Sequence, residues 1–149
     1  MKLKEIVLAQ CQLQISQKLN LLHKGLRDLL ESAGSETKSS AGDKFETGRA
    51  MLHIEQDHVR RQIAEALAQK AVLDSIVPGG VPERAGLGTL IRASGSYYFL
   101  STALGKIEVE GNSLIALSLQ SPLGSKFAGQ QPGASVTMNG KTMVIEELF

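Results

Sequence analysis

The fold is decided by residues 34–42, Gly-Ser-Glu-Thr-Lys-Ser-Ser-Ala-Gly, a polar stretch without an apolar period. This stretch separates two segments in which apolar residues recur every seven positions. The members are Leu8, Ile15, Leu22 and Leu29 (with Leu19 and Leu26 between them), then Leu52, Val59, Ala66 and Leu73 (with Ile63 interleaved). Such a recurrence forms a narrow apolar stripe that is buried against another helix. Two helices joined by one loop predict an antiparallel helical hairpin over residues 1–77, a coiled coil with its tip loop at 34–43.

The composition changes beyond residue 77. All four prolines and 11 of the 15 glycines follow this position. Residues 78–88 are predicted to be a linker, and 89–149 a small antiparallel β-sheet domain. Its strand-like runs are 89–93, 97–102, 106–110, 114–119, 135–138 and 142–147, with Asn139-Gly140 as a strong hairpin turn. Ser121-Pro122 is typical of the start of a short helix, here ending at Phe127. The expected class is therefore α+β.

Charge and cysteine content exclude several classes of protein. The net charge is +1 and is evenly spread, with no basic stripe that would bind duplex nucleic acid through its phosphates. Contact with nucleic acid is expected only indirectly, through a partner. Cys11 is the single cysteine, so it forms no intrachain disulfide; its helical surroundings favour an inert thiol over a nucleophile. No apolar run reaches the ~20 residues of a membrane span, and we expect a cytoplasmic protein.

Asp43 and Glu46 are candidate functional residues where the tip loop meets the second helix. Three residues apart, they lie on one face of a helix. One interpretation is a capping box, in which both side chains accept hydrogen bonds from backbone amides and fix the helix start. The other is a pair of carboxylates that helps to hold Mg²⁺ in a partner's phosphodiester site, because Mg²⁺ is commonly bound by one or two protein carboxylates together with phosphate oxygens. The spacing allows both.

Three features make the sequence resemble the Gre family of bacterial transcript cleavage factors. The first is the order of the parts, since the family has an N-terminal coiled-coil hairpin followed by a small FKBP-like β domain. The second is the tip, where Gly42-Asp43-Lys44-Phe45-Glu46 fits the family's G-D-x-x-E and Glu55 falls on a further family acid. The third is the segment 121–129, Ser-Pro-Leu-Gly-Ser-Lys-Phe-Ala-Gly, which is similar to the family's S-P-(Ile/Leu)-x-x-x-x-x-G.

The resemblance implies a function and a partner. The β domain would dock on RNA polymerase, with Ser121, Pro122, Leu123, Phe127 and Gly129 as the partner-binding residues. The hairpin would enter the secondary channel, where Asp43 and Glu46 would help the polymerase's active site to hold a second Mg²⁺ and hydrolyse backtracked RNA. The protein would then be a monomeric elongation factor without its own enzymatic activity or a tightly bound cofactor.

The sequence departs from the family pattern after Glu46. The family usually continues Asn-Ala-Glu-Tyr, whereas this chain has Thr47-Gly48-Arg49-Ala50, so an acid is replaced by Arg49 and the aromatic residue is missing. This leaves open a second interpretation, a regulator that binds the same channel without stimulating cleavage.

Three other classes of protein are weighed against these two. A metal site at His53, Asp57 and His58 lacks a fourth ligand nearby, which favours a solvated helix face. A prolyl isomerase needs an aromatic-walled pocket, but alternation places Tyr97 and Tyr98 on opposite faces of a strand. A dimeric coiled coil is disfavoured because the nine-residue polar stretch would interrupt its helix.

Overall fold

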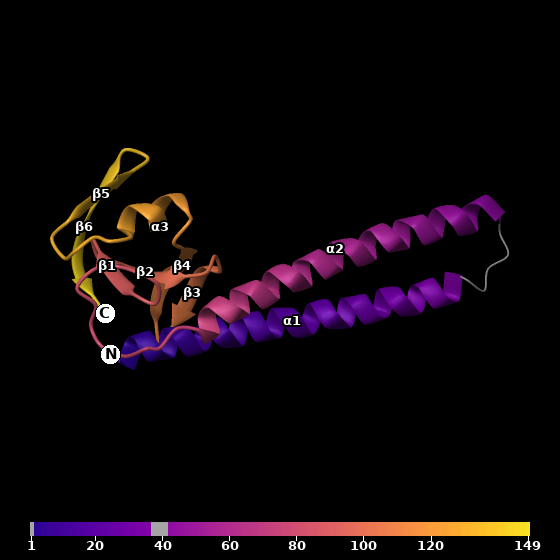
Figure 1. Ribbon diagram of the computed structural model, residues 1–149, viewed down its shortest axis with the longest axis horizontal. Helices are drawn as coiled ribbons and strands as arrows, with labels where there is room; N and C mark the ends of the chain where they lie inside the picture. The colour runs from indigo at the N-terminus through magenta and orange to yellow at the C-terminus, as the bar shows by residue number, and fades with distance from the viewer. Residues whose placement is uncertain (1, 37–41) are drawn as a thin grey trace. The chain divides into compact units, whose positions relative to one another are not determined.

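The computed structural model describes residues 2–36 and 42–149, and it describes side chains at residues 2–32 and 46–149. Helix α1 spans Lys2–Glu36 and helix α2 spans Gly42–Asp74. Residues 14–70 form one compact unit, in which the two helices run alongside each other in opposite directions (Figure 1). The predicted helical hairpin is therefore confirmed.

Both helices reach further toward the tip than the composition predicts. α1 continues to Glu36 and α2 begins at Gly42, so both ends of the loop predicted at 34–43 are helical. Each residue added to an existing helix gains a hydrogen bond after the costly first turn has formed, which offsets the weak propensity of Gly and Ser. Asp43, predicted at the N-cap, lies one residue inside α2 instead. Residues 37–41 of the predicted loop lie outside the described residues.

The sevenfold pattern correctly predicts the side of each helix that is buried. Ile15, Leu19, Ile63 and Ala66 are buried, and the remaining pattern positions of residues 14–70 are half-buried. Gln56 is an addition that the apolar pattern does not predict. It lies seven residues before Ile63, at the equivalent position of the stripe, and only 3% of it is exposed. A polar side chain at such a position favours one register of the helix pair over its alternatives.

The base of the hairpin belongs to the second compact unit, which contains residues 1–13 and 71–149. Val7, Cys11, Leu73 and Ile76 are buried in this unit, and the Gln12 Nε2 atom donates to Asp74 Oδ1 at 3.3 Å. Packing of the hairpin base on the β domain is expected from the small size of this domain, because about 60 residues bury too little surface to be very stable alone.

Six strands follow the linker and form one sheet. They are β1 (Leu90–Ala93), β2 (Ser96–Ser101), β3 (Gly105–Val109), β4 (Asn112–Ser118), β5 (Ser135–Met138) and β6 (Lys141–Leu148). Their order is β3-β4-β2-β1-β6-β5. The α+β class is confirmed, with one correction to the predicted antiparallel sheet: β2 and β4 pair in parallel. The strand β4 lies between β2 and β3. The chain reverses between β2 and β3 and again between β3 and β4, so β4 runs in the same direction as β2.

Three hairpins close with a two-residue turn that ends in glycine. Ser94-Gly95, Glu110-Gly111 and Asn139-Gly140 all have positive φ at both residues, from 46° to 80°. This is the backbone of a type I′ turn, whose twist matches that of the flanking strands.

The sheet is buried on both faces over much of its length. One face packs Ile91, Leu100, Leu117 and Ile145 with Phe127 of helix α3 (Pro122–Phe127). In Figure 1, α3 lies against the sheet. The alternate strand residues Leu90, Phe99, Ile107 and Leu114 are also buried, as expected from the alternation of side chains along a strand. No helix among the described residues is long and apolar enough to cross a membrane.

Candidate functional site

The segment 121–129 forms α3 and both of its ends, as the sequence predicts. Ser121 is the N-cap: its Oγ accepts a hydrogen bond from the Gly124 amide at 3.0 Å and donates to the Ser118 carbonyl at 2.7 Å. Pro122 occupies the first helical position, where its missing N–H costs nothing. The hydroxyl of Ser121 thus joins the helix start to the end of β4.

Three further residues of the segment have roles inside the domain. A Cβ atom on Gly124 would lie 1.9 Å from the Ser118 carbonyl oxygen, so only glycine allows α3 this close to β4. Phe127 is 0% exposed, and its ring lies against Tyr98 with centroids 5.2 Å apart. Gly129 has a φ of 79° and donates its N–H to Ala85 at 2.8 Å. These three residues fix the position of α3.

The predicted partner-binding residues therefore divide into two groups. Pro122 is exposed and Ser121 and Leu123 are half-buried, so these side chains are accessible to a partner. The ring of Phe127 is buried in the core and is not accessible to a partner. It contributes by anchoring α3 to the sheet. Gly129 is exposed and ends the segment. The role in partner binding itself stays a prediction, with Pro122 and Leu123 as its most accessible apolar contacts.

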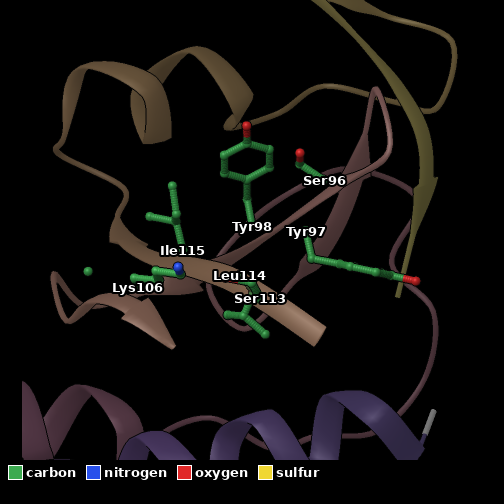
Figure 2. A pocket seen from close by; sticks show the side chains of 8 residues that line it. Ser96, Tyr97, Tyr98, Lys106, Ser113, Leu114 and Ile115 are labelled. Carbon is green, nitrogen blue, oxygen red and sulfur yellow. The ribbon is translucent and has the colours of Figure 1, made fainter. Parts of the chain in front are cut away.

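A groove of about 400 Å³ lies on β2, β3 and β4 and is lined mainly by apolar atoms. Strand register aligns Tyr98 with Ile115, and Ile115 with Lys106, in one row across the three strands. Ile115 is 45% exposed, although it is a large aliphatic residue. Figure 2 shows Tyr98 and Ile115 projecting on the same side of the sheet. The groove is therefore a surface that can accept an apolar side chain beside a cation, and the sequence analysis did not predict it.

The tip acids lie at the start of α2. Glu46 is exposed, as are Arg49 and Glu55, whereas the side chain of Asp43 lies outside the described residues. The helical backbone from Gly42 onward places residues 43 and 46 on one helical face. A capping box needs Asp43 at the N-cap, so the start of α2 at Gly42 does not favour that interpretation, and the metal-binding pair stays a prediction.

The polar residues His53, Asp57 and His58 of α2 are all exposed, and Asp57 pairs with Arg60 at 3.5 Å. Among the described residues, no group of three or more His, Cys, Asp or Glu side chains could hold a metal ion. The three residues thus lie on an exposed face of α2.

Cys11 is the one thiol of the chain, and it is fully buried in α1. Burial raises the pKa of this thiol to about 11, because the thiolate would lose its hydration. A thiol with so little thiolate at neutral pH is a poor nucleophile, in agreement with the inert interpretation.

The comparisons with known proteins find similar chains among solved structures. No family model and no curated protein matches this chain. Among solved structures, the chain is similar to GreA factor homolog 1 (Gfh1) of Thermus thermophilus, with 16% identity, a TM-score of 0.39, and coverage of 94% of this chain and 95% of that chain. It is also similar to a structure of the transcription factor Gfh1, with 18% identity, a TM-score of 0.39, and coverage of 93% of each chain. Neither likeness assigns an activity to this protein.

Proposed function

We propose that this protein is a transcription factor that binds RNA polymerase and inserts its hairpin into the secondary channel. The resemblance of the tip and of the segment 121–129 to the Gre family is the observation that carries the proposal. The hairpin supports it, because a helix of 33 residues has a length of about 50 Å and holds the tip acids far from the other end of the hairpin. The exposed side chains of Ile115 and Lys106, with the half-buried Tyr98 beside them, would supply a docking surface for the polymerase.

The proposed chemistry is stimulation of the polymerase's own cleavage of backtracked RNA. Asp43 and Glu46 would hold a Mg²⁺ ion together with the polymerase. The bound ion would lower the pKa of a water molecule, and the site would orient this water for attack on the phosphodiester. The metal and most of its ligands come from the polymerase, so the factor needs no tightly bound cofactor and is no nuclease alone. Glu46 is exposed, as this role requires.

A transcript cleavage assay on stalled, backtracked complexes of the cognate polymerase tests this proposal. The intact protein is expected to shorten the RNA, and the Asp43→Ala, Glu46→Ala double variant is expected to bind the polymerase without shortening it. Loss of binding in the double variant would show instead that the two acids fix the structure of the tip. No effect on RNA and no binding would refute the proposal.

A channel-binding regulator without cleavage activity is the second candidate, and Arg49 favours it. This residue is exposed three positions after Glu46, on the same side of α2. Its positive charge opposes the binding of a divalent cation by the tip acids. We expect Arg49→Glu to increase cleavage by about tenfold, equivalent to roughly 1.4 kcal/mol of metal affinity.

Arg61→Glu is the matched control for this prediction. It makes the same change in charge at another exposed position of α2, twelve residues further along the helix, and is expected to leave cleavage unchanged. If Arg49→Glu has no effect while the intact protein competes with a cleavage factor for the polymerase, the regulator without cleavage activity is the better description.

We further propose that the protein acts as a cytoplasmic monomer without isomerase activity. Tyr97 and Tyr98 both line the groove, but alternation along β2 directs their rings to different sides of the sheet, so they do not face each other as aromatic walls. Light scattering at micromolar concentration tests the monomer, and a proline-containing peptide assay tests the absence of isomerase activity.

A further inference from the structure

Lys4 is a largely buried lysine near the start of α1. Its side chain is only 4% exposed, whereas Lys2 and Glu5 on the same turn are exposed. Among the described residues, no carboxylate forms an ion pair with Lys4, and burial alone lowers the pKa of its ammonium group. The Nζ atom of Lys4 is not among the fully buried, unpaired polar atoms of the described residues, so the aliphatic stem is buried while the ammonium group stays accessible to a counter-ion.

The residue lines a pocket of about 210 Å³ within the unit formed by residues 1–13 and 71–149. The other walls come from the linker between Val77 and Pro82 and from residues 87–89. The lining is more polar than apolar, and the glycines at 79, 80 and 88 bring backbone close to the cavity. A small ligand can therefore be surrounded on several sides.

The electrostatic setting of the pocket favours an anion. Lys4 lies in the first turn of a 35-residue helix, where the positive end of the helix dipole repels cations and attracts anions. The polar groups of the far wall are already used: Gly88 N–H donates to Leu100, and Thr89 Oγ1 accepts from Gly86. Among the described residues that line the pocket, Lys4 is the one with a charged side chain.

The size of this charge restricts the anion. The nearest described acids along the chain are the exposed Glu5, beside Lys4, and the exposed Glu83, beside Pro82 of the lining. Both are negative and disfavour further negative charge. A single ammonium group balances one negative charge, so a carboxylate fits better than a doubly charged phosphate.

The rim of the pocket is apolar. Val77 is 82% exposed, Val81 72% and Leu87 48%, and all three line the same cavity. Apolar residues so exposed around Lys4 would contact the aliphatic part of a ligand whose charged end reaches the ammonium group.

We propose that this pocket binds a single carboxylate group carried on a small aliphatic moiety, with Lys4 as its counter-ion. The site is separate from the tip acids and does not depend on the proposed function. Its ligand is either a free small carboxylic acid or the acidic side chain of a protein segment, and the two share the same chemistry.

Titration with isobutyrate, followed through the backbone amide signals of Gly79, Gly80 and Gly88, tests the site. Isobutyramide is the matched control ligand, because it has the same shape without the charge. We expect saturable shifts with isobutyrate, with a dissociation constant on the order of 1 mM, and no saturation with the amide. The same titration with N-acetyl-leucyl-aspartate amide tests an acidic side chain of a protein segment as the source of the carboxylate. Whichever of this peptide and isobutyrate binds more tightly identifies the class of ligand.

Lys4→Met removes the charge and keeps most of the side-chain volume, and Lys2→Met is its matched control at an exposed position. Lys2→Met is expected to bind isobutyrate like the natural protein, whereas Lys4→Met loses at least about tenfold in affinity. Circular dichroism confirms that both variants fold. Equal binding by Lys4→Met, equal binding of the amide, tighter binding of inorganic phosphate, or no saturable shift at all would each overturn the proposal.

Discussion

At the scale of single residues, small side chains in the segment 121–129 determine where the accessible ones stand. Ser121 connects α3 to the end of β4 through two hydrogen bonds, and Gly124 allows close contact between them. Pro122 and Leu123 are thereby held at a fixed place at the start of α3. A sequence pattern that resembles a binding motif can thus consist largely of residues that build the binding surface.

Gly124→Ala is expected to destabilise the domain by about 3 kcal/mol, because the added methyl group overlaps the Ser118 carbonyl and forces α3 away from β4. Gly86→Ala is the control, since a Cβ atom there meets nothing within 4 Å and its φ is not positive. Urea denaturation of both variants measures the difference. Equal midpoints for the two would contradict the close packing of α3.

Cys11 gives a prediction for alkaline pH. Its pKa is raised from 9.0 to about 11 in the folded protein, so the protonated thiol is favoured by folding. This contribution is fully present below pH 9 and is lost as the pH rises toward about 11. We expect the natural protein to lose more stability across this window than Cys11→Ala, which is less stable by about 1 kcal/mol at neutral pH. Denaturation curves at both ends of the pH window provide the comparison. An equal loss of stability in the natural protein and in Cys11→Ala would refute the prediction.

At the scale of elements, the turn between β3 and β4 carries a residue that is poorly suited to its backbone. Glu110 has a φ of 48°, which costs most residues about 1 kcal/mol but is tolerated by Asn. Glu110→Asn is therefore expected to stabilise the protein by up to about 1 kcal/mol. Glu108→Asn makes the same change within extended β3, where Asn is disfavoured, and serves as the control. Thermal unfolding of both variants measures the effect. Stabilisation by both substitutions would mean that the loss of a negative charge, and not the backbone conformation at residue 110, is the cause.

The elements also illustrate what periodicity can predict. Sevenfold recurrence correctly identified the buried sides of both helices, and alternation between turn signals located all six strands. Pairing is not contained in either pattern, so the parallel contact between β2 and β4 could not be predicted from them. The burial of Gln56 was missed because an apolar pattern ignores polar members of the same stripe.

At the scale of the whole molecule, the candidate sites differ in how well the sequence indicates them. The tip acids and the segment 121–129 are contiguous, so a motif can reveal them. The groove at Tyr98, Ile115 and Lys106 depends on strand register, and the pocket at Lys4 brings together residues more than 70 positions apart. A lysine near a helix start is normally solvated, so only the folded chain reveals its burial.

The division into compact units leads to the last prediction. Residues 1–13 belong with 71–149, so replacing residues 14–70 by a short flexible linker should leave a folded domain. A chain that begins at Ala71 lacks Val7, Leu8 and Cys11, which are buried in the intact unit. Each buried apolar side chain contributes about 1.5–3 kcal/mol, so the shorter chain should be less stable by several kcal/mol.

Urea denaturation and amide signal dispersion of the two shortened proteins provide the measurement. The linked protein is expected to unfold cooperatively with the dispersed signals of a β-sheet, and the chain from Ala71 to lose this behaviour at lower urea concentration. Equal stability of the two would mean that the first turns of α1 contribute nothing to the sheet. In the linked protein, the thiol of Cys11 reports on the same contact, because it should react slowly with thiol reagents as long as the unit stays folded.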